Sequence, residues 1–262
     1  MTPCNNPSGD GREAIPLTVG SPQTKTREVP ASFFDVDGTL VRTNLLHPTF
    51  FYLANQPNPF RSLSALARAA AGGPRMALAE MVDRRRFNEL LFAVYKGISH
   101  DRLLLLADEA FDAVVRRGLY PGARDLVQRS LAKGHEVVLV SGALDFLMER
   151  LVKHLGATAH ISNRLEIKDG YATGRLLRPI VAGPEKARLL REWAKEREID
   201  LGGCFAYSDS YSDVPMLSVV GHPCAVNPDM RLFKLARTYA WPVIRLDMGK
   251  RSAARDLWER LP

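Results

Sequence analysis

The chain alternates short apolar runs with helical segments, and this alternation is the feature that most constrains its fold. The apolar runs that we interpret as buried strands are residues 31–34, 135–140, 203–207 and 224–226. Apolar residues at helical spacing lie between them, at residues 123–133, 144–155 and 185–198. This order favours an α/β fold with a doubly wound parallel sheet, because the connecting helices must cover both faces of such a sheet.

One long helical stretch interrupts the alternation after the first strand. Apolar residues recur at three- and four-residue spacing from residue 45 to residue 118, and no strand pattern appears among them. The Gly-Gly-Pro and Gly-Ile-Ser sequences at residues 72–74 and 97–99 are expected to separate its helices. The domain prediction is therefore a helical cap, residues 45–118, inserted into a catalytic core that consists of residues 30–44 and 119–246.

Three further segments complete the predicted organisation. Residues 1–29 are rich in Pro, Gly, Ser, Thr and Asn and predict a disordered tail, and residues 247–262 predict a basic C-terminal tail. Residues 164–176 predict a β-hairpin because the central Asp169-Gly170 pair favours the positive φ angles of a tight turn. We expect this hairpin to act as a flap.

The composition excludes several classes of protein. With 46% hydrophobic and 25% charged residues, the chain resembles an ordinary globular protein. The net charge of +7 is compatible with anionic ligands, but no dense basic run with interleaved aromatic residues indicates nucleic-acid binding. No apolar run approaches the roughly 20 residues that cross a bilayer, and no leader segment is evident. We expect a cytoplasmic protein with no transmembrane segment and no nucleic-acid partner, and the oligomeric state stays open.

Polar side chains follow three of the predicted strands. Asp35 and Asp37 follow the first, Ser141 the second and Asp209 the third. The carboxyl ends of parallel strands meet at one edge of a sheet, which is where such sheets bind ligands. Carboxylates that meet there require a cation, and hard oxygen ligands select Mg²⁺. The sequence therefore predicts a magnesium site.

Four segments together resemble the motifs of one known family. The sequences FFDVDGTL, VLVSGA and YSDSYSDVPML, with Lys186 at a helix start, resemble the four motifs of the haloacid dehalogenase (HAD) superfamily, in order and in placement. The helical insertion resembles the cap of its phosphoserine-phosphatase-like branch, subfamily IB. The resemblance covers roughly residues 31–230 and implies a HAD-like Rossmannoid core.

This resemblance implies a mechanism and a role for each residue. Asp35 is expected to attack phosphorus and form an aspartyl-phosphate, and Asp37 to act as general acid and base. Mg²⁺ is expected to bind Asp35, the backbone carbonyl of Asp37, and Asp209. The residues expected to contact the phosphate are Gly38, Thr39, Ser141 and Gly142. Lys186 is expected to assist catalysis. Asp213 is expected to orient Lys186 or a metal-bound water.

The substrate is less constrained. Members of the branch that hydrolyse phosphoserine carry a glutamate about nine residues after the nucleophile, whereas this chain has Asn44 there. In the cap, an arginine such as Arg86 could meet a second anionic group and the neighbouring apolar residues could meet an acyl chain, although a cap core with a solvated face explains the same pattern. We therefore predict a Mg²⁺-dependent phosphatase for a small or lysophospholipid-like phosphate monoester. A phosphotransferase or phosphomutase, and a non-catalytic binding protein, are the alternatives.

Overall fold

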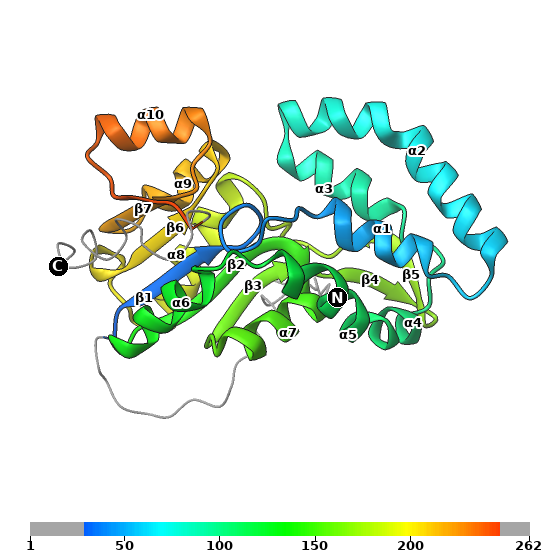
Figure 1. Ribbon diagram of the computed structural model, residues 1–262, viewed down its shortest axis with the longest axis horizontal. Helices are drawn as coiled ribbons and strands as arrows, with labels where there is room; N and C mark the ends of the chain where they lie inside the picture. The colour runs from blue at the N-terminus through cyan, green and yellow to red at the C-terminus, as the bar shows by residue number, and fades with distance from the viewer. Residues whose placement is uncertain (1–28, 247–262) are drawn as a thin grey trace, which may run out of the picture.

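The core of the molecule is a six-stranded parallel sheet (Figure 1). The computed structural model describes residues 29–246, so the predicted tails lie outside the described residues except for Val29, the last residue of the predicted N-terminal tail. The strand order is β3-β2-β1-β6-β7-β8, and all neighbouring strands run parallel. The strands are β1 (Ala31–Asp35), β2 (Glu136–Leu144), β3 (Ala159–Asn163), β6 (Phe205–Ser208), β7 (His222–Val226) and β8 (Val243–Ile244). The predicted doubly wound sheet is confirmed.

Helices cover both faces of this sheet, which explains why its strands are apolar on both sides. Phe33 of β1 packs edge-on against Trp193 on one face, with ring centroids 5.4 Å apart, while Phe34 stacks on Tyr207 on the other face at 4.3 Å. The covering helices are α6 (Ala123–Ala132), α7 (Asp145–Leu155), α8 (Pro184–Glu196), α9 (Val214–Leu217) and α10 (Met230–Thr238). Short 3-10 turns at Leu201–Gly203 and Tyr211–Asp213 precede β6 and α9.

The chain order creates a switch point in the sheet. From β1 the chain builds outward through β2 and β3, and then returns to place β6 on the other side of β1. The connections on the two sides of β1 diverge, and the crevice at the carboxyl ends of such strands is where doubly wound sheets bind ligands. Residues that follow β1 and β6 therefore lie side by side.

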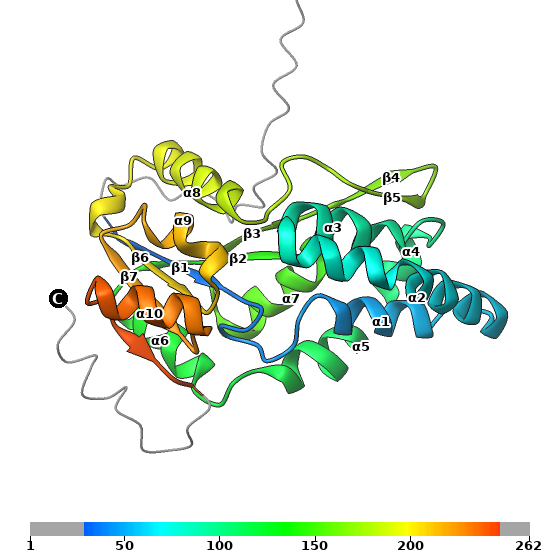
Figure 2. The ribbon, with the colours of Figure 1, turned by 90° about the horizontal axis from the view of Figure 1, so that it is seen from above.

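A group of helices lies beyond the carboxyl ends of the strands (Figures 1 and 2). It consists of α1 (Leu46–Ala54), α2 (Pro59–Val82), α3 (Arg84–Ala93), α4 (His100–Leu105), α5 (Ala107–Ala110) and a π-helical turn (Phe111–Arg116). The predicted break at residues 72–74 is wrong, because α2 runs through it with Pro74 inside the helix. A proline removes one backbone hydrogen bond from a helix. Here Ala69 and Met76 on either side pack against the core and hold the helix together.

The predicted β-hairpin is present and packs on these helices (Figure 2). Strands β4 (Leu165–Lys168) and β5 (Tyr171–Leu176) pair antiparallel, and Asp169 and Gly170 have the expected positive φ angles of 50° and 78°. Gly97, at the second predicted break, has a φ of 83° and lies in the turn between α3 and α4. Its amide donates to the carbonyl of Ala172 at 2.8 Å, and the amide of Ala172 donates to the carbonyl of Ile98 at 2.8 Å. The hairpin is thus tied to the helical insertion.

The strands β3 and β8 and the helix α10 were not predicted from the sequence. In the part of the chain that the structure describes, no helix combines the length and the apolarity that crossing a bilayer requires.

Candidate active site

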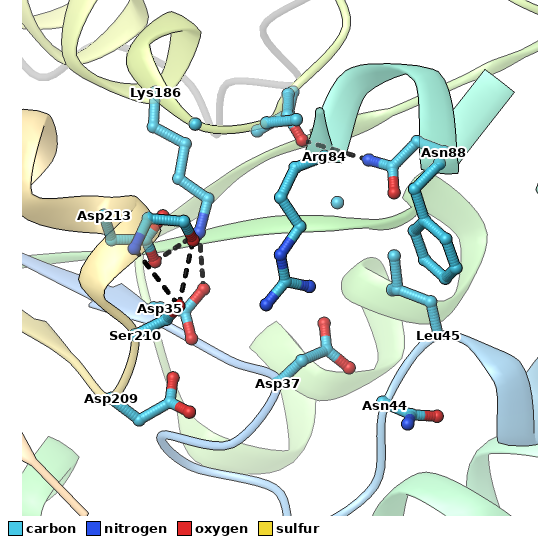
Figure 3. A pocket seen from close by; sticks show the side chains of 16 residues that line it. Asp35, Asp37, Asn44, Leu45, Arg84, Asn88, Lys186, Asp209, Ser210 and Asp213 are labelled. Carbon is cyan, nitrogen blue, oxygen red and sulfur yellow. Dashed lines mark hydrogen bonds and ion pairs between the residues drawn. The ribbon is translucent and has the colours of Figure 1, made fainter. Parts of the chain in front are cut away.

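Two carboxylates meet at the switch point of the sheet (Figure 3). Asp35 is the last residue of β1, and Asp209 follows β6, which is the neighbour of β1. The hydroxyl of Thr39 bridges them, with Oγ1 at 2.8 Å from Asp35 Oδ2 and 3.0 Å from Asp209 Oδ1. Thr39 is fully buried, so its hydroxyl holds the carboxylates in place and does not reach the pocket.

Gly38 makes room for the second carboxylate. Its φ of 87° lies in the left-handed region that favours glycine, and a Cβ atom there would lie 2.1 Å from Asp209 Oδ2. Its amide donates to the carbonyl of Val41 at 2.7 Å and is therefore engaged within the turn. The structure thus assigns Gly38 and Thr39 to positioning the carboxylates, in contrast to the phosphate contacts expected from the sequence.

Lys186 lies in the first turn of α8 and is held between two carboxylates (Figure 3). Its Nζ donates to Asp35 Oδ1 at 2.6 Å and to Asp213 Oδ2 at 2.8 Å. Asp213 Oδ2 also accepts a hydrogen bond from Ser208 Oγ at 2.8 Å. Burial opposes the charged form of Lys186, but Asp213 and Asp35 outweigh it and raise the pKa of the lysine. Asp213 thus contacts Lys186, and its expected role of orienting Lys186 or a metal-bound water stays a prediction.

Asp35 and Asp37 have different surroundings although only one residue separates them. Burial raises the pKa of Asp35, while Lys186 and the hydroxyl of Thr39 oppose that rise. For Asp37, burial and the nearby Asp35 raise the pKa to about 7, and only a single side-chain hydrogen bond, from Ser141 Oγ at 2.9 Å, opposes them strongly. Asp35 is thus held in an ion pair with Lys186, whereas Asp37, with a pKa of about 7, can gain or lose a proton near neutral pH.

The donor atoms at this site fit a hard divalent cation. Burial and the nearby Asp35 raise the pKa of Asp209 to about 8, and no lysine or arginine of the described residues forms an ion pair with it. Within residues 29–246, no group of three or more His, Cys, Asp or Glu side chains is arranged as a metal site. Two adjacent carboxylates, with water to complete the coordination, are the kind of oxygen ligands that Mg²⁺ accepts.

A pocket of about 60 Å³ opens in front of these carboxylates, which is room for a small group such as a phosphoryl. Asp35, Asp37, Lys186, Asp209 and Asp213 all line it, and so do Ser210 and Ser212. These two serines, which lie between Asp209 and Asp213 in the fourth motif, were not among the residues predicted from the sequence.

The cap contributes Arg84 to this pocket, in place of the expected Arg86 (Figure 3). The guanidinium of Arg84 points towards Asp37, whose pKa it lowers slightly, and no described carboxylate forms an ion pair with it. Arg86 does not line the pocket; its side chain is 75% exposed and lies 3.8 Å from Asp83. Helical spacing could have found Arg84, because it lies one turn before the buried residues Phe87 and Asn88.

Gly142 lines the pocket where the core meets the cap. A Cβ there would lie 2.9 Å from Asn88 Nδ2 and 3.3 Å from Leu45 Cδ1, so Gly142 allows close packing of the cap. Its carbonyl accepts a hydrogen bond from the buried Asn163 at 2.8 Å, and Asn163 Oδ1 accepts from the amide of Val181 at 2.8 Å. Asn163 thus joins two walls of the pocket, a role that no sequence pattern indicated.

Two other predicted contacts have partial support in the geometry. Ser141 is fully buried, donates to Asp37 and accepts from the amide of Ala143 at 2.9 Å, so its hydroxyl positions the proposed acid and base. Asn44 lines the pocket, but its Oδ1 also accepts from the amide of Leu46 at 3.1 Å. It carries no charge that could recognise an ammonium group.

Sequence comparisons agree with this geometry. A family model described as haloacid dehalogenase-like hydrolase matches residues 32–218. The phosphoserine phosphatase SerB1 of Mycobacterium tuberculosis (strain ATCC 25618 / H37Rv) is 33% identical over 224 residues, which cover 85% of this chain and 73% of that protein. A phosphoserine phosphatase of Streptococcus thermophilus is 30% identical over 188 residues, 71% of this chain and 79% of that protein. The chain therefore belongs to the haloacid dehalogenase-like hydrolases.

Solved structures show the same fold. A protein of unknown function from Bordetella pertussis Tohama I superimposes with a TM-score of 0.71 at 24% identity, covering 83% of this chain and 99% of that one. A substrate-bound phosphoserine phosphatase superimposes with a TM-score of 0.64 at 18% identity, covering 90% of this chain and 100% of that one. With these relatives, the chain is an enzyme of the phosphatase type within its family.

Proposed function

We propose that this protein is a Mg²⁺-dependent phosphatase that hydrolyses a phosphate monoester through an aspartyl-phosphate on Asp35. The observation that carries this proposal is the contrast between two neighbouring carboxylates. Asp35 is paired with Lys186 at 2.6 Å, whereas Asp37 has a pKa near 7 and faces the same pocket. One group is thereby suited to attack phosphorus and the other to carry a proton.

The first half-reaction transfers the phosphoryl group to the protein. A carboxylate oxygen of Asp35 forms a bond to phosphorus as the bond between phosphorus and the ester oxygen breaks. Protonated Asp37 donates its proton to that leaving oxygen, so an alcohol departs. The Lys186 ammonium keeps Asp35 in place during attack, and Asp213 keeps Lys186 in place.

The second half-reaction reverses the role of Asp37. Its carboxylate now takes a proton from water, and the resulting hydroxide attacks phosphorus while the bond to Asp35 breaks. Inorganic phosphate leaves, and Asp35 and protonated Asp37 are restored. The residues that would hold Mg²⁺ are Asp35, the carbonyl of Asp37, and Asp209, and the ion would neutralise negative charge on the carboxylates and on the phosphoryl oxygens.

The substrate we propose is a phosphorylated small molecule, and two features of the pocket bear on its identity. Arg84 supplies a guanidinium beside Asp37, which favours a substrate with a second anionic group near the phosphate. Asn44 offers no carboxylate for an ammonium group. Phosphoserine is the substrate in the names of two relatives. We consider esters without an ammonium group better candidates for this protein than phosphoserine. A lysophospholipid-like ester is one such candidate. Location in the cytoplasm stays a prediction.

Phosphate release tests the proposed reaction. With p-nitrophenyl phosphate and Mg²⁺, we expect steady release of inorganic phosphate that EDTA abolishes and that Asp35→Asn reduces by at least about a thousandfold. Undiminished activity of Asp35→Asn would remove Asp35 as the nucleophile. Adding glycerol separates hydrolysis from transfer, since capture of most of the phosphoryl group by glycerol would make the enzyme a phosphotransferase.

Two arginines on the same helix form a matched pair for testing substrate recognition. Arg84→Met should lower kcat/KM at least roughly tenfold for esters that carry a second anionic group, and less for p-nitrophenyl phosphate. Arg86→Met should leave both values near those of the wild type, because Arg86 lies outside the pocket. Equal effects of the two substitutions would exclude Arg84 as a substrate contact.

A further inference from the structure

A second cavity lies inside the helical cap. Residues of α1, α2 and α3 line it, and its volume is about 520 Å³, which is within the range of small-molecule sites in proteins. The pocket at Asp35 is about 60 Å³ and can take little more than the phosphoryl group. The cavity is therefore large enough for a substrate group that the phosphate pocket cannot hold.

Among its described lining residues, the cavity offers no polar partner to a ligand. Thr49 is the one residue of its described lining with a polar side chain. The Thr49 hydroxyl donates to the carbonyl of Leu45 at 2.8 Å and accepts from the Tyr95 hydroxyl at 3.2 Å, so its hydrogen bonds are made within the protein. A cavity whose lining has no unmet polar atom favours hydrocarbon over water or a charged group.

The cavity and the phosphate pocket lie next to each other and share one lining residue. Phe87 lines both. Arg84 lies one turn before Phe87 on α3 and lines the phosphate pocket, and Leu91 lies one turn after it and lines the cavity. Along a single helix face, the protein thus passes from a guanidinium to an aromatic ring and then to an aliphatic side chain.

We propose that this cavity holds the aliphatic chain of a single-chain phosphate monoester whose phosphoryl group is bound at Asp35. This proposal rests on the phosphatase function and names the class of its substrate. Charge complementarity fixes the orientation, because Lys186 and Arg84 attract the anionic end while the cavity has no partner for it. Leu46 and Phe50, which line the cavity, are 41% and 62% exposed, so this side of the cavity faces solvent.

Gly73 provides the means to fill the cavity without disturbing the site. It lines the cavity, lies within α2, and has nothing within 4 Å of the position of a Cβ atom. Phenylalanine at this position should therefore occupy space that the chain would use. Ala71 lies on the same helix, is exposed and does not line the cavity, so Ala71→Phe is the matched control for Gly73→Phe.

Calorimetric titration with methyl-, hexyl- and decylphosphonate in the presence of Mg²⁺ tests the proposal. Affinity for the wild type should rise about two- to fourfold with each added methylene until the cavity is filled. Gly73→Phe should lose this dependence while binding methylphosphonate as the wild type does, and Ala71→Phe should keep it. Equal affinities for the three ligands in the wild type, or equal losses in both variants, would overturn the proposal.

Turnover of the matching alkyl phosphates separates this proposal from the phosphatase function. Hydrolysis of all three esters with one common kcat/KM would leave the phosphatase function standing and refute the chain site. Absence of hydrolysis for all three, together with chain-length-dependent phosphonate binding that Gly73→Phe abolishes, would refute the phosphatase function and support the chain site.

Discussion

Replacing Lys186 with methionine removes the cation that holds two buried carboxylates together. Its Nζ lies 2.6 Å from Asp35 Oδ1 and 2.8 Å from Asp213 Oδ2, and all three side chains are at most 7% exposed. In the variant, two buried negative charges would face each other without compensation. We therefore expect Lys186→Met to destabilise the folded state as well as to impair catalysis.

The size of the effect follows from these distances. With an effective dielectric constant of about 20, each contact is worth roughly 6 kcal/mol of Coulomb energy before desolvation. Most of that energy offsets the cost of burying the ions, and losing one partner of a buried pair costs about 3–5 kcal/mol. We expect Lys186→Met to lower the free energy of unfolding by about 3–5 kcal/mol at neutral pH.

Urea unfolding in EDTA measures this loss, since no metal can then replace the lysine. The double variant Lys186→Met/Asp213→Asn should regain roughly half of it, because one of the two charges is removed, while activity stays low. Lower pH should also raise the free energy of unfolding of Lys186→Met. Burial raises the pKa of Asp35, so the folded state takes up a proton more readily than the unfolded state and gains stability as the pH falls. A loss under about 1 kcal/mol, or a double variant less stable than the single one, would refute this account.

Three further predictions follow from other parts of the structure. Gly38→Ala places a methyl group 2.1 Å from Asp209 Oδ2, so the Mg²⁺ concentration for half-maximal activity should rise at least roughly tenfold. Gly134→Ala, at a similar φ but in open space, should leave that concentration unchanged, and equal shifts would contradict the role of Gly38. Ser141→Ala removes a hydrogen bond that lowers the pKa of Asp37, so the pKa of Asp37 should rise. Because attack needs protonated Asp37, the fall of kcat/KM with rising pH should move to higher pH. An unchanged pH profile would contradict this prediction. Burial lowers the pKa of His160 to about 4. Between about pH 6.5 and 4, the imidazole is therefore protonated in the unfolded state and neutral in the folded state. The free energy of unfolding of the wild type should fall by on the order of 3 kcal/mol across that window. His160→Gln should lose distinctly less, and parallel losses in urea titrations would rule out His160 as the cause.

The strand ends of the core could be predicted from the sequence because they depend on local patterns. An apolar run followed by Asp35 specifies a buried strand that delivers a carboxylate, and the same holds for Asp209. The parallel arrangement then brings these ends together. The short edge strands β3 and β8 could not be predicted because a few residues carry too little periodic signal. These strands form by pairing with their neighbours in the sheet.

The cap was harder to predict because its details depend on packing between helices. Residues 72–74 resemble a helix break, yet contacts of Ala69 and Met76 with the core keep α2 continuous. The choice between Arg84 and Arg86 depends on which face of α3 meets the core, and Phe87 decides it. The apolar residues of the cap suggested a contact with an acyl chain, but the cavity itself arises from the spacing of three helices, which no local pattern specifies.

The central claim is that Asp35 becomes phosphorylated, and rapid acid quench followed by peptide mass spectrometry tests it most directly. Asp37→Asn, mixed with p-nitrophenyl phosphate and Mg²⁺, should accumulate the intermediate because its hydrolysis lacks a general base, while the good leaving group needs no acid. We predict one added phosphoryl group on the peptide that contains Asp35, and none in Asp35→Asn. Release of p-nitrophenol without any adduct, or an adduct on another residue, would contradict the account.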